Sequence, residues 1–186
     1  IIIKFYFDMS QHKLFNHSQV NICLERLAYQ LLENHGDFSE TVLVGLQPRG
    51  KFLSKNIVNV LKNNYNLRDL NYGYLDITFF RDDFRTKTNV LIPNETNFKL
   101  NINDKKVVFI DDVLYTGRTI RAALTAIESF GRPKSIELLI LINRRYSREL
   151  PIQADYKGFN VDLYEDQKVC VNWSENNNYV YLENIK

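Results

Sequence analysis

Hydrophobic residues in this 186-residue chain alternate between helical spacing and short continuous runs. Between residues 18 and 34 the apolar positions recur three or four apart, which predicts a helix capped by Ser18 and stopped by Gly36. Residues 41–46 form an uninterrupted apolar run, which is typical of a buried strand, and helical spacing returns over 53–61. The order of strand, loop and helix indicates an α/β unit.

The alternation continues toward the C-terminus. Residues 72–80 are rich in aromatic and β-branched side chains, and residues 105–110 and 135–143 are continuous apolar runs, so three further strands are expected. A helix ended by Gly131 and Pro133 separates the last two runs. Continuous apolar strands alternating with helices predict a parallel sheet covered on both faces.

Three regions depart from this pattern. Residues 81–103 are polar and have no clear period, which favours a functional loop. Residues 144–186 contain two short strand-like pieces, KVCVNW and YVYLE, so a hairpin or small hood is expected there. Residues 1–17 are taken as an N-terminal extension, and residues 18–186 as a single domain.

Composition and charge limit the possible functions. The chain has 24 Lys and Arg against 22 Asp and Glu, a formal charge of +2, which argues against nucleic-acid binding by bulk electrostatics. Two cysteines and three histidines do not suffice for a disulfide framework or a zinc site, so a reducing cytoplasm is expected. Every apolar run is shorter than the roughly 20 residues that cross a bilayer, so no membrane partner is expected.

The segment after the strand at 105–110 carries the strongest chemical signal. Asp111 and Asp112 stand at the expected strand exit, and residues 116–119, Thr-Gly-Arg-Thr, open the next helix. A helix N-terminus offers unpaired N–H groups to an anion, so these residues predict a phosphate cradle. The acidic pair suits a ligand with hydroxyls beside its phosphate, such as a ribose 5-phosphate, or a hydrated magnesium ion. The alternative is that the aspartates cap the helix and the Thr-Gly pair forms a turn.

A second glycine-containing loop follows the strand at 41–46. Residues 45–51, GLQPRGK, fit the first seven positions of the G-x-x-x-x-G-K-[ST] nucleotide-binding loop. Phe52 stands where that loop needs Ser or Thr, and Pro48 removes one backbone amide. The sequence therefore argues against an ATP-type loop here.

The string IDDVLYTGRTIRAAL resembles the phosphoribosyl-diphosphate signature of type I phosphoribosyltransferases. VGLQPRG, LDITFFRDD, GRPKSIELLILI and RELPIQADYKG extend the resemblance to the PyrR family, over about residues 18–175. The resemblance implies a five-stranded, mainly parallel sheet with flanking helices, a flexible active-site loop and a small hood. It also implies the reaction of uracil with 5-phosphoribosyl 1-diphosphate to give UMP and diphosphate, in a cytoplasmic homodimer or larger assembly.

The resemblance also assigns roles to residues. Asp111 and Asp112 would face the ribose hydroxyls and a magnesium ion held mainly by substrate and water. The 5-phosphate would bind the residues of the signature, which are Tyr115, Thr116, Gly117, Arg118 and Thr119. The diphosphate would bind Pro48, Arg49 and Gly50. The flexible loop over 81–103 would bring in Arg81 as a catalytic residue, together with Asp82 and Asp83.

Departures from the family pattern carry two further expectations. Type I enzymes often hold a non-proline cis peptide in the diphosphate loop, so we predict that Gln47–Pro48 is cis. The hood segment reads VDLY at 161–164, where the family has Ile-Pro-Thr-Ser, and Asn143-Arg144-Arg145 replaces Asp-Arg-Gly. We expect Val161 to lie in the base pocket, and a purine base remains an alternative to uracil.

Regulatory members of the family bind pyrimidine-operon messenger RNA through a basic face. Arg26 and Arg148 keep the matching cations, and they are the candidate RNA residues here. Glu25, Tyr29 and Gln153 stand where the family has Thr, His and Arg, which predicts fewer phosphate contacts. A UMP-responsive RNA attenuator with weak catalysis is the alternative function.

Overall fold

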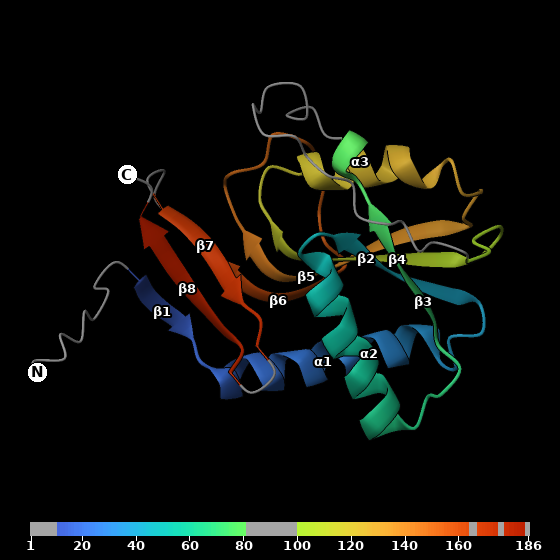
Figure 1. Ribbon diagram of the computed structural model, residues 1–186, viewed down its shortest axis with the longest axis horizontal. Coiled ribbons are helices and arrows are strands. Elements are labelled where there is room, and N and C mark those ends of the chain that lie inside the picture. Colours follow the sequence, from blue (N-terminus) through green and yellow to red (C-terminus); the bar gives the residue numbers. More distant parts are fainter. Residues whose placement is uncertain (1–10, 81–99, 164–166, 175–176, 185–186) are drawn as a thin grey trace, which may run out of the picture. The chain divides into compact units, whose positions relative to one another are not determined.

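The computed structural model describes residues 11–80, 100–163, 167–174 and 177–184 (Figure 1). Its elements in chain order are β1 (Gln11–Phe15), α1 (His17–His35), β2 (Thr41–Gln47), α2 (Gly50–Tyr65), β3 (Asn71–Asp76), the 3₁₀ helix η1 (Thr78–Phe80), β4 (Lys106–Leu114), α3 (Arg118–Ile127), β5 (Ser135–Arg144), β6 (Tyr156–Val161), β7 (Gln167–Asn172) and β8 (Tyr179–Asn184).

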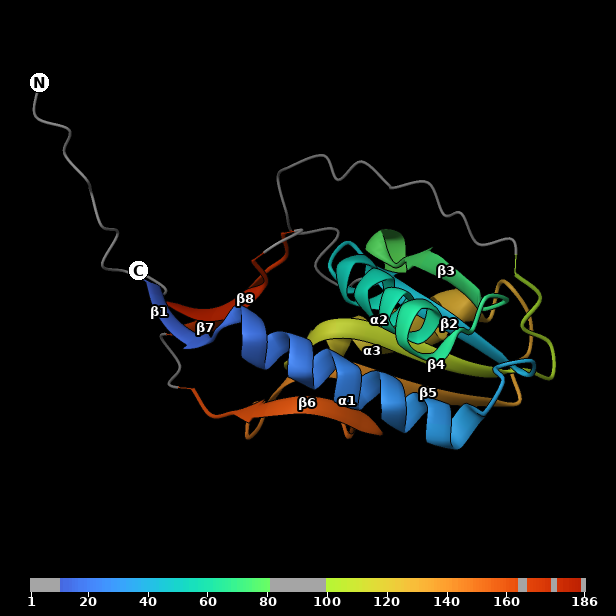
Figure 2. The same ribbon diagram turned by 90° about the horizontal axis from the view of Figure 1, so that it is seen from below.

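Five strands form one parallel sheet in the order β3-β2-β4-β5-β6. Figures 1 and 2 show α3 on one face of this sheet and α1 and α2 on the other. Every residue of β2 is buried, because helices cover both faces of the strand. The expected α/β class and parallel sheet are confirmed.

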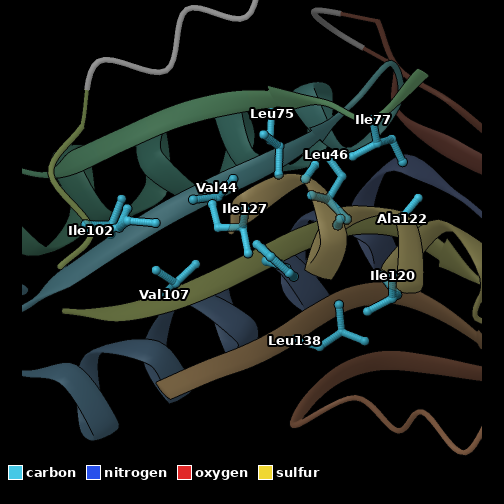
Figure 3. Close-up of a cluster of buried hydrophobic side chains, with 14 of the residues drawn as sticks. Val44, Leu46, Leu75, Ile77, Ile102, Val107, Ile120, Ala122, Ile127 and Leu138 are labelled. Atoms are coloured by element: carbon cyan, nitrogen blue, oxygen red, sulfur yellow. The ribbon is translucent and has the colours of Figure 1, made fainter. Parts of the chain in front are cut away.

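Side chains of β2, β3, β4 and β5 form a core with the buried face of α3 (Figure 3). Phe109, Leu75 and Ile140 from the strands lie in one cluster with Ala123 and Ile127 from the helix. Each fully buried Leu, Ile or Phe side chain stabilises the fold by roughly 1.5–3 kcal/mol relative to an exposed position. This packing fixes α3 on the sheet, and with it the segment that leads from β4 into α3.

Several boundaries differ from the sequence expectation. β3 ends at Asp76, because the Asp76 carboxylate accepts hydrogen bonds from the backbone N (2.8 Å) and hydroxyl (2.6 Å) of Thr78. β4 continues to Leu114, so Asp111 and Asp112 lie within the strand and not beyond it. The fifth strand of the large sheet is β6, which falls in the 144–186 region expected to form a hood.

A second, antiparallel sheet has the strand order β1-β8-β7. Its β7–β8 pair confirms the hairpin expected from KVCVNW and YVYLE. β1 pairs with β8, so residues 11–15 are a strand where an extension was expected. By their internal contacts the described residues form two compact units, one that holds residues 11–22 and the described residues from 163 onward, and one that holds the described residues of 23–162.

The start of α1 also differs from the expectation. Asn16 Oδ1 accepts a hydrogen bond from Gln19 N (3.0 Å), and Gln19 Oε1 accepts one from Asn16 N (2.9 Å). This reciprocal pair is a capping box, so Asn16, and not Ser18, caps the helix. The Gln47–Pro48 peptide bond is cis, as predicted. Among the described residues, no helix has the length and apolar character needed to cross a membrane.

Candidate functional site

The loops that follow β2 and β4 meet at one end of the large sheet. In the order β3-β2-β4-β5-β6 the direction of chain progression reverses between β2 and β4, which is the place where open parallel sheets bind ligands. Gly50 shows how closely the two loops approach. A Cβ at this position would lie 2.2 Å from Ile110 O and 3.1 Å from Asp111 Cα, so only glycine fits without a backbone shift.

A pocket of about 310 Å³ opens at this end of β4. It is lined by Asp111, by Glu149 and by residues 115–119, which we call the phosphate loop. The phosphate loop includes the first two residues of α3, and the first N–H groups of a helix have no acceptor within the helix itself. All five residues predicted to bind the 5-phosphate therefore lie around one pocket.

Gly117 shapes the phosphate loop. Its φ of +95° lies in the left-handed region, which residues with a Cβ rarely adopt. An added Cβ would also lie 3.2 Å from Ile152 Cδ1 and 3.4 Å from Leu150 Cβ. The Thr116 hydroxyl accepts a hydrogen bond from Arg118 N (3.4 Å), so it supports the helix start in this structure.

The two predicted catalytic aspartates occupy different surroundings. Successive side chains of a strand point to opposite faces, so Asp111 lines the pocket beside α3 while Asp112 faces the loop before α2. There Asp112 Oδ2 accepts a hydrogen bond from Arg49 Nε (2.6 Å). Burial raises the pKa of Asp112 above its ordinary value, and the Arg49 guanidinium opposes this shift. The positive charge of Arg49 therefore compensates for the burial of the Asp112 carboxyl group.

The two carboxylates fit a magnesium ion held mainly by water and substrate better than one held entirely by protein ligands. Within the part of the chain that the structure describes, no group of three or more His, Cys, Asp or Glu residues could hold a metal. Asp111 and Asp112 are both buried at the end of the sheet, so each offers oxygen atoms, which magnesium prefers. Magnesium usually keeps several waters and binds substrate phosphates, which agrees with this donor set.

Two contacts next to the pocket were not predicted from the sequence. Glu149 Oε2 accepts a hydrogen bond from Arg118 Nε (2.7 Å) at the pocket wall. The guanidinium carbon of the buried Arg144 lies 3.9 Å from the centroid of the Tyr115 ring, a cation–π contact. Glu149 follows the phosphate loop by about 30 residues, so no local pattern could have placed it there; RELPI within the family resemblance was the available signal.

The remaining predicted residues have separate surroundings. Val161 is buried and pairs in register with Arg144, but it does not line the pocket. Arg26 Nη2 donates hydrogen bonds to the backbone oxygens of Lys157 (3.2 Å) and Gly158. Arg81, Asp82 and Asp83 lie outside the described residues.

The model of the phosphoribosyl transferase domain family matches residues 10–176 of this chain. Among curated proteins, the "Bifunctional protein PyrR" of Caldicellulosiruptor bescii is 41% identical over 170 residues, which cover 90% of this chain and 92% of that protein. The protein of the same name from Ligilactobacillus salivarius is 43% identical over 150 residues, or 80% of this chain and 83% of the relative.

Solved structures agree with the fold. A hypoxanthine phosphoribosyltransferase from Staphylococcus aureus superposes with a TM-score of 0.64 at 18% identity, over 84% of this chain and 79% of that one. The hypoxanthine phosphoribosyl transferase of Trypanosoma cruzi gives a TM-score of 0.65 at 15% identity, over 82% and 78% of the two chains. The sequence matches and the shared fold confirm the resemblance seen in the motifs: the chain belongs to the phosphoribosyltransferase family and, within it, to the PyrR family.

Proposed function

We propose that this protein transfers the phosphoribosyl group of 5-phosphoribosyl 1-diphosphate to uracil, giving UMP and diphosphate. The observation that carries the proposal is the meeting of three features at one sheet end: the phosphate loop, the Asp111 carboxylate, and the Arg49–Asp112 pair. A phosphate site, a hydroxyl acceptor and a cation are what a phosphoribosyl diphosphate requires. Curated relatives over 40% identical carry the name PyrR, which supports this branch of the family.

Each group has a task that follows from its position. The phosphate loop offers backbone N–H groups and the positive end of α3 to the 5-phosphate. Asp111 is an acceptor for ribose hydroxyls at the same pocket. Arg49, held by Asp112, places a cation for the diphosphate just beyond the end of β2.

The reaction needs positioning more than covalent chemistry from the protein. As the diphosphate leaves, positive charge develops at the anomeric carbon of the ribose. Anchoring the 5-phosphate at the phosphate loop and the hydroxyls at Asp111 fixes that carbon relative to the incoming base. A magnesium ion, held through Asp111, Asp112, water and the substrate, would neutralise charge on the departing diphosphate.

Two observations bear on the other proposed activities. Arg26 and Arg148, the candidate RNA residues, both donate guanidinium hydrogens to backbone carbonyls of this chain. These internal contacts support catalysis, rather than RNA binding, as the main function. The hypoxanthine enzymes among the solved structures are under 20% identical, so they support the fold and not a purine substrate.

The test is a panel of bases with phosphoribosyl diphosphate and magnesium, read by diphosphate release. We expect uracil to be turned over well ahead of hypoxanthine and guanine. The Asp112→Asn variant should lose about 10²–10³ in kcat, the size of effect expected when one fixed charge at a reaction centre is removed.

The matched control is Asp69→Asn, an exposed carboxylate outside the pocket, which should retain wild-type turnover. Release of diphosphate with a purine but not with uracil would replace the proposed substrate. Wild-type protein that releases no diphosphate with any base would overturn the transferase proposal itself.

A further inference from the structure

The carbonyl groups of the phosphate loop pose a physical problem. Across a trans peptide plane, the C=O of one residue and the N–H of the next point in opposite directions. If the N–H groups of Tyr115, Thr116 and Gly117 face an anion, the preceding carbonyls must face away from it and need hydrogen-bond partners inside the protein. The groups that satisfy these carbonyls therefore decide which way the N–H groups point.

One short segment, residues 148–150, supplies a partner for each of the three carbonyls. Arg148 Nη1 donates to Leu114 O (3.1 Å) and to Tyr115 O. The backbone N–H groups of Glu149 and Leu150 both donate to Thr116 O, at 3.1 and 3.2 Å. Three successive carbonyls thus accept hydrogen bonds from three successive residues of the facing segment.

Arg148 is itself held on several sides. Its Nε donates to Ile152 O (3.0 Å), its Nη1 also reaches Arg144 O (3.1 Å), and its Nη2 donates to Asn143 Oδ1. The side chain is only partly exposed. The guanidinium is therefore directed at the backbone around the phosphate loop and not toward solvent.

Neighbouring contacts hold the same two segments together. The close approach of Leu150 and Ile152 leaves no comfortable room for a side chain at Gly117. At the far end of the loop, Glu149 pairs with Arg118. Residues 148–152 thus contact residues 114–118, and Arg148 bonds the carbonyls of Leu114, at the end of β4, and of Tyr115.

We propose that Arg148 is a positioning residue for the 5-phosphate site: by bonding the carbonyls of Leu114 and Tyr115, it turns the N–H groups of Tyr115 and Thr116 toward the pocket. The inference rests on the proposed function, because it takes the anion to be the 5-phosphate of the substrate. Arg148 does not contact the substrate in this account. Its effect reaches the ligand only through the orientation of the backbone.

The test compares two ligands that use different loops. Calorimetric titration of wild type, Arg148→Lys and Arg148→Gln with ribose 5-phosphate reports on the phosphate loop, and titration with inorganic diphosphate reports on the loop at Arg49. Lysine keeps the charge but lacks the planar fork of donors. We expect both variants to raise the Kd for ribose 5-phosphate about 10- to 100-fold, the size of effect that follows loss of a hydrogen-bond partner behind a metal ligand, and to change the Kd for diphosphate less than about threefold.

The matched control is Arg26→Lys, which replaces another arginine that donates to backbone carbonyls, those of Lys157 and Gly158, far from the phosphate loop in sequence and outside the pocket lining. It should leave the Kd of both ligands unchanged. Asn143→Ala removes one hydrogen-bond acceptor of Arg148 and should also weaken ribose 5-phosphate binding, by a smaller factor. This variant replaces the Arg148 variants in the test if they do not fold.

Arg148 variants that bind ribose 5-phosphate as the wild type does would overturn the inference, and so would equal weakening of both ligands, which indicates a general structural role. If Arg148 variants do not fold, unchanged ribose 5-phosphate binding by Asn143→Ala would overturn it as well. Wild-type protein that binds neither ligand would instead overturn the proposed function, and the wild-type titrations show this before any variant is compared.

Discussion

At the scale of single residues, Gly50 links the two loops of the site. It opens α2, and its missing side chain allows the start of α2 to approach Ile110 and Asp111 in β4. The same approach brings Arg49 to Asp112. A glycine that appeared in the sequence as part of an incomplete nucleotide-binding loop is therefore required by close backbone contact.

Gly50→Ala should lower the free energy of unfolding by about 1–3 kcal/mol, because a Cβ there overlaps a backbone oxygen that cannot move independently. It should also weaken inorganic diphosphate binding, since the Arg49 loop must shift. Chemical denaturation and calorimetry measure the two effects. Gly36→Ala is the control. Its left-handed φ should cost about 1 kcal/mol of stability, but no heavy atom lies within 4 Å of an added Cβ, so diphosphate binding should stay intact. Equal diphosphate affinity in both variants would contradict this account of Gly50.

His35 is a second residue whose surroundings have a measurable consequence. Its side chain is fully buried, with Nδ1 3.0 Å from Thr41 Oγ1 and Nε2 3.2 Å from Glu137 Oε2. The hydroxyl of Tyr156 donates to the same carboxylate oxygen at 2.6 Å. Burial lowers the pKa of His35, and Glu137 only partly opposes this shift, so the folded protein holds the imidazole neutral below its ordinary pKa.

The stability of the protein should therefore fall as the pH drops below about 6.5, because the unfolded chain then binds a proton that folded His35 does not. The contribution is complete above pH 6.5 and is lost toward the lower folded pKa, with a slope of at most about 1.4 kcal/mol per pH unit. Urea denaturation of wild type and His35→Asn between pH 5 and 7.5 measures this slope. Identical pH dependence in the two proteins would show that another group is responsible.

At the scale of elements, the capping box at the start of α1 shows how local signals compete. Ser18 is a good capping residue, but Asn16 and Gln19 together satisfy two backbone N–H groups where a lone serine satisfies one. The helix therefore begins at His17, one residue before the expected start.

Asn16→Ala should lower the free energy of unfolding by about 1 kcal/mol, the usual effect of removing an N-cap. Gln19→Ala should have a smaller effect, and the double variant should cost less than the two single effects added, because each side chain supports the other. Thermal or urea unfolding of the four proteins gives the coupling. Strictly additive effects would mean that the two hydrogen bonds act independently and that the pair is not coupled. Ribose 5-phosphate affinity is the control that should not change.

At the scale of the whole molecule, ligand binding should couple to folding because the site is assembled from distant segments. The phosphate loop follows β4, the segment that contacts it spans residues 148–152, and Arg49 follows β2. None of these contacts exists in an unfolded chain. A ligand bound at the assembled site therefore stabilises the native state by mass action.

UMP at 100 times its Kd should raise the free energy of unfolding by about 2.7 kcal/mol, whereas uridine at the same concentration should raise it much less. The two ligands differ only in the 5-phosphate, which is the group that the phosphate loop would bind. Denaturant unfolding with each ligand measures the difference. Equal stabilisation by UMP and uridine would contradict the assignment of the phosphate loop.

Much of this architecture is encoded locally. Continuous apolar runs and helical spacing placed β2, β4, β5 and the three helices within a few residues, because strands buried on both faces and amphipathic helices have distinct periods. The family resemblance also singled out Asp111 and residues 115–119, which line one pocket in the structure. The pattern did not predict the end of β3 or the strands at the edges of the two sheets. β3 stops at the Asp76 turn, β6 joins the large sheet, and β1 pairs with a strand about 170 residues away.

The sequence alone determined the fold class and the membership of the family, and it proposed residues 115–119 for the phosphate, because these depend on short-range periodicity and on contiguous motifs. Tertiary structure alone decided how the parts work together. It paired Asp112 with Arg49 and turned Arg148 onto the carbonyls of Leu114 and Tyr115. These contacts join residues more than 30 positions apart, and hydrogen-bond geometry across such separations leaves no period in the sequence.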